Sequence, residues 1–162
     1  MDDTDRHHLA RCVDLAEEAL RAGNAPFGSV LVAAGGQVLA EDHNRIGGGD
    51  STQHPEFALA RWAAANMTPA ERAAATMYTS GEHCPMCAAA HAWVGLGRIV
   101  YAGSSAQLVE WRAAAGGRPL PVNALPIQAV APGLKVEGPE PSLSERLRAL
   151  HTRRVMNELA AP

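Results

Sequence analysis

Two short motifs, His54-Pro55-Glu56 and Cys84-Pro85-Met86-Cys87, constrain the fold of this 162-residue chain more than any other feature. In both, a proline stands directly after a residue that can bind a metal ion. Proline is favoured at the first position of a helix, where its missing N–H group costs nothing. Good helix formers fill residues 57–62, and Ser51 and Thr52 are candidate caps before them. We therefore expect each motif to begin a helix, with its polar side chains projecting from the helix start.

The residue types in these motifs are those that bind zinc. Cys84 and Cys87 offer thiolates, which helix N-termini stabilise, and His54 offers an imidazole nitrogen. A cysteine pair of this spacing could equally be a redox pair or half of a structural finger, but the sequence holds no second such pair. Three protein ligands leave one tetrahedral position for water, which is typical of a catalytic zinc site. Two thiolates and an imidazole weaken the metal as a Lewis acid, so a nearby base would be useful, and Glu56 is placed to be that base.

The combination of His54-x-Glu56 with Cys84-x-x-Cys87 resembles the signature of the cytidine deaminase-like superfamily of zinc-dependent nucleobase deaminases. The resemblance runs from the first predicted helix to a strand around Ile99. Residues 24–30, together with the cysteine motif, look most like the bacterial guanine deaminase branch, which acts on free bases. The chain departs from that pattern before the first cysteine, where His83 replaces a proline, and at Gly81, where guanine deaminases often have cysteine.

The resemblance implies a reaction. The chain is expected to convert an amino group on a flat nitrogen heterocycle into a carbonyl and to release ammonia, with one zinc ion per chain. Guanine is the first expected substrate, and cytosine and amino-triazines are alternatives. Glu56 would take a proton from the attacking water and return it to a ring nitrogen and to the departing ammonia.

Four further residues are expected near the substrate. By the resemblance, Asn44 would hydrogen-bond the base, Phe27 would line its pocket and Glu82 would face it. Trp111 lies outside the shared motifs and could either stack on a flat ring or simply pack. Simpler interpretations remain for the first three residues: a turn residue for Asn44, core packing for Phe27 and stabilisation of the adjacent turn for Glu82.

Hydrophobic patterning predicts an α/β fold. Residues 29–33 and 37–40 form two strands joined by a glycine turn, so they should pair antiparallel. Strands at residues 76–80 and 98–102 flank the cysteine helix and should be parallel, because a strand–helix–strand crossover is right-handed. The other expected elements are helices at residues 5–22 and 106–115, a fifth strand at residues 127–130, and a last helix opened by a capping box at residues 142–145. The expected architecture is a three-layer α/β/α sandwich with a central mixed five-stranded sheet, formed by residues 1–162 as a single deaminase domain.

The remaining cysteine, histidine and tryptophan residues have simpler expected roles. Cys12 has no disulfide partner and should be a small buried hydrophobic residue. His83 is the nearest candidate for the fourth ligand of a structural zinc, and His91 should pack or reach solvent. Trp93 is expected in the core, and His7, His8 and His43 are expected on the surface.

Composition favours a small-molecule enzyme. The net charge is −3, no run of about 18 apolar residues exists, and the acidic start is unlike a signal peptide, so we expect a cytoplasmic protein without membrane contact. One rival is a tRNA adenosine deaminase, for which a local basic patch is available: Arg146, Arg148, Arg153 and Arg154. The other is a non-catalytic structural zinc module, which would have no need of Glu56. The resemblance also implies a homodimer, in which a C-terminal segment of one chain closes the pocket of the other.

Overall fold

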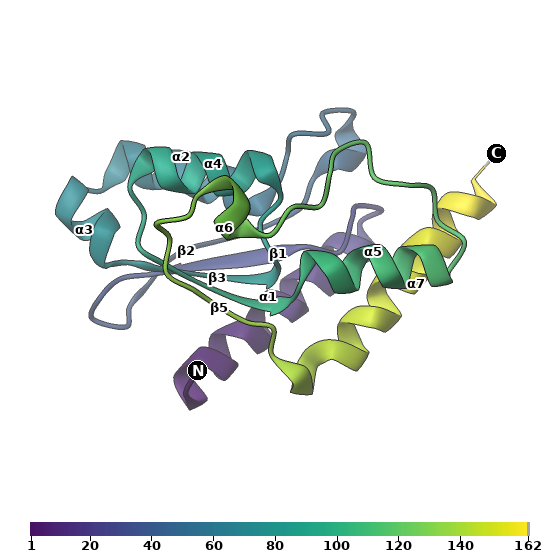
Figure 1. Ribbon diagram of the computed structural model, residues 1–162, viewed down its shortest axis with the longest axis horizontal. Coiled ribbons are helices and arrows are strands. Elements are labelled where there is room, and N and C mark those ends of the chain that lie inside the picture. Colours follow the sequence, from purple (N-terminus) through teal and green to yellow (C-terminus); the bar gives the residue numbers. More distant parts are fainter. Residues whose placement is uncertain (162) are drawn as a thin grey trace.

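A mixed five-stranded sheet lies between two layers of helices, as predicted (Figure 1). The computed structural model describes residues 1–161, and Pro162, the last residue of the predicted domain, lies outside the described residues. The strand order is β2-β1-β3-β4-β5. The strands are β1 (Gly28–Val32), β2 (Val38–His43), β3 (Thr76–Gly81), β4 (Arg98–Gly103) and β5 (Val136–Glu137). β1 pairs antiparallel with β2 and β3, whereas β4 pairs parallel with β3 and β5, which confirms both predicted strand pairs.

The helices divide between the two faces of the sheet (Figure 1). One layer contains α1 (Asp3–Arg21), α5 (Ser105–Ala114) and α7 (Ser144–Ala160). The other contains α2 (Pro55–Asn66), α3 (Pro69–Ala74), α4 (Pro85–Val94) and α6 (Ile127–Val130). Two short 3-10 turns, η1 (Ile46–Gly48) and η2 (Pro141–Leu143), lie in the connections.

Side-chain alternation along β1 explains why both faces of the sheet are covered. Val30 packs into the core beneath α1 and α7, with Leu9 and Leu147, whereas the next residue, Leu31, packs beneath α2 with Leu59. Every residue of β1 is buried, as expected for a strand with helices on both sides. The central strands therefore form a rigid base for the helices above them.

The fold brings the starts of α2 and α4 together. These two helices pack against each other along their length. His54 is the N-cap of α2 and Cys84 the N-cap of α4, and each is followed by its proline. No side-chain hydrogen bond caps α2, so the predicted capping by Ser51 or Thr52 is wrong.

Local patterns failed in three places. The fifth strand is Val136–Glu137, because residues 127–130 form the short helix α6, whose Ile127 is buried against Ala88. A segment of only four residues is too short to be assigned to strand or helix by periodicity alone. Residues 142–145 do not form a capping box, since the Glu140 side chain instead accepts a hydrogen bond from the Ser142 N–H. Thr68-Pro69 indicates a loop or short turn in the sequence, whereas the structure has the helix α3 there, with a capping box formed by Thr68 and Glu71.

The burial of three side chains tests the positions expected for them. Trp93 is 90% exposed on α4, so its predicted core position is wrong. His8 is buried against Tyr78 rather than lying on the surface. Cys12 is fully buried, as predicted. Within residues 1–161, no helix combines the length and apolar character needed to cross a membrane.

Candidate active site

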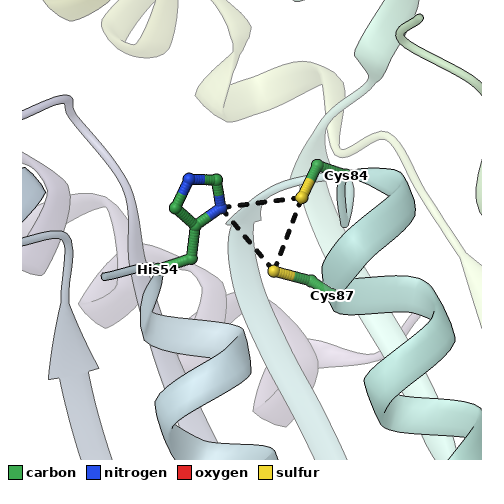
Figure 2. Close-up of side chains that lie close together, drawn as sticks. All are labelled: His54, Cys84 and Cys87. Carbon is green, nitrogen blue, oxygen red and sulfur yellow. Dashed lines mark hydrogen bonds between the residues drawn. The ribbon is translucent and has the colours of Figure 1, made fainter. Parts of the chain in front are cut away.

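Three side chains from the two helix starts converge on one point (Figure 2). The Nδ1 atom of His54 lies 3.6 Å from the sulfur of Cys84 and 3.6 Å from that of Cys87, and the two sulfurs lie 3.6 Å apart. A tetrahedral zinc ion, with bonds of about 2.3 Å to sulfur and about 2.0 Å to nitrogen, needs ligand atoms about 3.5–3.8 Å apart. These residues therefore fit one zinc ion, as predicted, and residues 1–161 contain no other group of three such side chains so close together.

Hydrogen bonding within this cluster favours a thiolate at Cys84. The hydrogen bond between the sulfurs of Cys84 and Cys87 lowers the pKa of Cys84 to about 4. The same hydrogen bond raises the pKa of Cys87, and the hydrogen bond between His54 and Cys84 raises the pKa of His54. A divalent ion bound here would displace the protons that these ligands carry.

Glu56 lies in the first turn of α2, beside the metal-binding cluster, and is only 5% exposed. Its Oε1 atom accepts hydrogen bonds from Ser29 Oγ at 3.0 Å and from Thr79 Oγ1 at 2.9 Å. Its Oε2 atom lies 3.5 Å from the sulfur of Cys87. Burial raises the pKa of the Glu56 carboxyl. One oxygen is therefore fixed, and the other faces the position where a metal-activated water would react.

The two hydroxyl groups that hold Glu56 were not among the predicted site residues. Ser29 and Thr79 are directly paired across β1 and β3, and both are fully buried. Ser29 is the one polar side chain in β1, which is a weak sequence signal, whereas Thr79 shares β3 with other polar residues and has no such signal. Neither strand sequence identifies Glu56 as the partner, because Glu56 lies on a different element.

A pocket in front of the metal-binding cluster is lined by His54, Cys84 and Glu56 on one side. Phe27, predicted to contact substrate, lines the same pocket, together with Leu108, Leu120, Val122 and Ala124. The structure thus brings Phe27 to the pocket that contains the cluster.

The packing of Phe27 accounts for one departure from the family pattern. A Cβ atom at Gly81 would lie 2.8 Å from Cε1 of Phe27, so the aromatic ring occupies the space that a side chain at residue 81 would need. On its other side the Phe27 ring packs against His151 of α7, with ring centroids 5.1 Å apart. The ring is therefore fixed by its neighbours before any substrate binds.

Asn44 is 1% exposed and lies beside Phe27, whose carbonyl oxygen accepts a hydrogen bond from the Asn44 main-chain N–H at 3.0 Å. The Asn44 Oδ1 atom accepts from Ile46 N–H at 3.2 Å. Its Nδ2 group has no partner among residues 1–161. A buried amide with an unused donor is costly unless another molecule accepts from it.

Glu82 and Trp111 have protein partners in the structure. Both carboxylate oxygens of Glu82 accept main-chain hydrogen bonds, from Ser105 and Ile127. Trp111 is half-buried, stacks on His151 with centroids 6.0 Å apart, and lines a small hollow beside the zinc pocket. The packing interpretation of Trp111 is therefore the one that the contacts support.

The other two histidines near the cysteine motif lie outside the metal-binding cluster. His83 is buried edge-on against His91, with ring centroids 5.4 Å apart, so its position gives no support for a fourth protein ligand. His91 is buried, and its Nε2 atom donates a hydrogen bond to the carbonyl oxygen of Gly97 at 2.9 Å, which agrees with the packing role that was one of its two expected roles. Because that partner is a carbonyl oxygen, Nε2 carries the proton.

Comparison with known proteins agrees with this geometry. The family model described as "Cytidine and deoxycytidylate deaminase zinc-binding region" matches residues 2–103, which contain the whole metal-binding cluster and Glu56. The chain belongs to this family. It is therefore a zinc-dependent deaminase, and the predicted family and chemistry are confirmed.

Individual members of the deaminase family extend the match over most of the chain. A probable cytosine deaminase of Schizosaccharomyces pombe is 29% identical over 141 residues, 86% of each chain. The guanine deaminase of Bacillus subtilis is 33% identical over 103 residues, 63% of this chain and 66% of its own.

Solved structures of the deaminase family share the fold. A guanine deaminase from Nitrosomonas europaea superposes with a TM-score of 0.65 at 22% identity, covering 89% of this chain and 82% of its own. A tRNA:A34 deaminase superposes with a TM-score of 0.63 at 26% identity, covering 90% and 99%. The predicted cytidine deaminase-like architecture is confirmed.

Proposed function

We propose that this deaminase acts on a free amino-substituted nitrogen heterocycle, with guanine as the first candidate and cytosine and amino-triazines as alternatives. The observation that carries the proposal is the position of Glu56, whose free oxygen lies beside the cluster of His54, Cys84 and Cys87. A structural zinc site has no use for a buried carboxylate held in this way. Relatives named as cytosine and guanine deaminases support a free base as substrate.

In this proposal, zinc held by the three ligands supplies the Lewis acid that activates the attacking water. Glu56 would take one proton from that water and pass it to a ring nitrogen. It would then take the proton of the newly added hydroxyl group and pass it to the amino group, which leaves as ammonia as the carbonyl forms. Ser29 and Thr79 keep Oε1 in place, so the proton passes through Oε2. Because the carboxyl is buried and its pKa is raised, it can hold a proton between the two steps.

The pocket supports an uncharged ring as substrate. Phe27 offers an aromatic face, and we propose that Asn44 gives its unpartnered Nδ2 donor to an acceptor on the ring edge. No lysine or arginine lines the pocket, whereas Glu56 and Glu82 bring carboxylates to it. A phosphate group would therefore find no cation there, so we expect bases to be preferred over nucleotides.

The tRNA alternative has less support from surface charge. Three of the four arginines proposed for a basic patch form ion pairs on the chain itself: Arg146 with Asp14 and Glu17, Arg148 with Glu145, and Arg154 with Glu158. These carboxylates cancel much of the positive charge that a phosphate backbone would need. Similarity to a solved tRNA:A34 deaminase nevertheless makes an anticodon stem-loop a necessary member of the substrate panel.

The deciding experiment is ammonia release by zinc-analysed protein from guanine, cytosine, adenine, their nucleosides, amino-triazines and a tRNA anticodon stem-loop. We expect one free base to be preferred. The Glu56→Gln variant should keep one zinc per chain and lose at least about 10²–10⁴-fold in turnover, because one group serves as base and acid. Glu145→Gln, at an exposed site in the first turn of α7, is the matched control. Near-normal turnover in zinc-loaded Glu56→Gln protein would refute the mechanism, and a silent panel would favour a non-catalytic role.

We also propose that the chain forms a homodimer through the layer of α2 and α4. Trp93 on α4 is 90% exposed and Trp62 on α2 is 36% exposed. Two large aromatic side chains exposed to water are unfavourable on the surface of a monomer, and a second subunit would cover them. Leu147 and Val155 of α7 are fully buried within their own chain. A C-terminal segment that closes the pocket of a partner subunit would therefore have to begin after Val155. Light scattering should show a dimer for the wild type and a monomer for Trp93→Glu. A monomeric wild type at micromolar concentration would refute the proposal.

A further inference from the structure

Glu82 occupies a junction between the sheet and the pocket. It directly follows β3, and its main-chain N–H donates to the carbonyl oxygen of Gly103, the last residue of β4, at 2.7 Å. Its backbone is therefore fixed where the carboxyl ends of two parallel strands meet. From this position its side chain forms part of the wall of the zinc pocket.

The two oxygens of the Glu82 carboxylate each hold the start of a helix. Oε2 accepts from the N–H of Ser105, the first residue of α5, at 2.8 Å. Oε1 accepts from the N–H of Ile127, the first residue of α6, at 3.0 Å. N–H groups at a helix start have no partner within the helix, and a carboxylate is the acceptor that binds them most strongly. Both oxygens are thus engaged by the protein, although Glu82 was predicted to face the substrate.

Residues 105–127 lie between these two anchored N–H groups and supply part of the wall of the zinc pocket. α5 is held along its length by packing against α7. The stretch that follows, residues 118–125, has less support, because its one main-chain hydrogen bond joins Leu125 to Asn123 within the stretch itself. The side chains of this stretch that line the pocket are Leu120, Val122 and Ala124.

We propose that Glu82 is a positioning residue that sets substrate affinity and selectivity by holding both ends of residues 105–127 in place. The carboxylate acts through the pocket wall, since the wall segment between α5 and α6 has almost no hydrogen bonds of its own to the rest of the fold. The burial of the Ile127 side chain limits how far the segment can move when the carboxylate is changed. The proposal deepens the proposed deaminase activity, but its structural part can be tested without any substrate.

The test begins with amide hydrogen exchange of zinc-loaded, ligand-free protein. Glu82→Gln preserves the length and shape of the side chain but replaces one acceptor oxygen with an NH₂ group, so it can satisfy only one of the two N–H groups. A charge-assisted hydrogen bond is worth roughly a factor of ten in an opening equilibrium. We therefore expect exchange at Ser105 or Ile127 to accelerate about tenfold or more, with the zinc content unchanged. Glu145→Gln should leave both rates unchanged.

The second part is steady-state kinetics on the preferred base. If Glu82 acts through the wall, Glu82→Gln should raise KM about tenfold and change kcat by no more than about twofold, because uniform binding is lost while the reacting groups stay in place. The Leu120→Ala variant, which shortens a wall side chain, should also raise KM. The double variant should cost less than the product of the two single effects, because both substitutions act on the same wall.

Three results would overturn the proposal, and each points elsewhere. Unchanged exchange at both N–H groups with a raised KM would assign Glu82 to direct substrate contact. A loss of kcat with an unchanged KM would place it in the chemical step. Unchanged exchange and unchanged kinetics would make it dispensable. If no heterocycle is deaminated, the proposed function fails, yet the exchange rates still decide whether Glu82 anchors the segment.

Discussion

The buried histidine of α7 should make the protein sensitive to mild acid. His151 is 4% exposed and packs between the rings of Phe27 and Trp111, with no carboxylate beside it. Burial lowers its pKa from 6.5 to about 3, and the positive charge of Arg112 acts in the same direction. His151 is therefore neutral in the folded protein over the whole pH range in which most enzymes are assayed.

The sign and size of the effect follow from proton linkage. Between pH 6.5 and about pH 3 the unfolded chain binds a proton at His151 that the folded chain does not, so the free energy of unfolding falls as the pH falls through this window. Each pH unit below 6.5 costs about 1.4 kcal/mol, so His151 alone should remove about 2 kcal/mol of stability between pH 8 and pH 5. Above pH 6.5 it should have no such effect.

Urea unfolding at pH 8 and pH 5 measures this loss in the wild type and in His151→Phe, at one protein concentration and with zinc present. The variant keeps an aromatic ring but cannot bind a proton. Contributions from the zinc ligands and from other buried histidines are common to both proteins and cancel in the comparison. The wild type should lose about 2 kcal/mol more than the variant on acidification. Equal losses, or a His151 ring resonance that titrates between pH 5 and pH 8, would refute the reasoning.

Three further changes test the scaffold and the metal. Gly28→Ala should lower stability by about 1–3 kcal/mol, because its Cβ would lie 2.6 Å and 2.8 Å from two main-chain atoms of α1. Gly48→Ala is the control, because a Cβ there meets nothing within 4 Å. Equal thermal midpoints for the two variants would contradict this reasoning. Asp5→Asn should lower the free energy of unfolding in urea by about 3 kcal/mol, because Arg98 binds both Asp5 oxygens at 2.8 and 2.9 Å. Asp3→Asn is the control, because the Asp3 side chain is fully exposed and its ion pair with Arg6 adds little. Removal of zinc with a strong chelator should lower the thermal midpoint and make two thiols reactive, and added zinc should reverse both effects. An unchanged midpoint after treatment with the chelator would contradict zinc binding at this cluster.

The sequence located the metal-binding residues because the relevant signal is local. A proline after His54 and another after Cys84 mark two helix starts, and each helix start presents its side chains at its end. The same local logic correctly placed α1, whose apolar residues recur at helical spacing, and the hairpin of β1 and β2. These features depend on residues within one turn or one hairpin of each other.

Residue roles set by distant contacts could not be predicted. Thr79 and Ser29 hold Glu56 from positions 23 and 27 residues away, and Glu82 reaches Ser105 and Ile127 across 23 and 45 residues. No local pattern encodes those pairings.

The predicted core position of Trp93 failed for a related reason. α4 consists mostly of apolar residues on all sides, so its sequence has no polar stripe to indicate which face points outward. A helix of this kind can present an aromatic side chain to solvent or to a partner without any change in its local pattern.

The distribution of the pocket along the chain explains why the reaction is easier to infer than the substrate. The metal-binding cluster and Glu56 lie within residues 2–103, the part of the chain that matches the family. Four apolar residues that line the same pocket all lie beyond residue 103: Leu108, Leu120, Val122 and Ala124. In the proposed function, the shared part provides the reacting groups, and residues beyond 103 provide part of the surface against which a ring would lie. In the proposal for Glu82, that residue belongs to the first part and anchors the second. We therefore expect substitutions within residues 105–127 to alter substrate preference while the reacting groups stay in place, provided that the anchored N–H groups stay where the carboxylate can reach them.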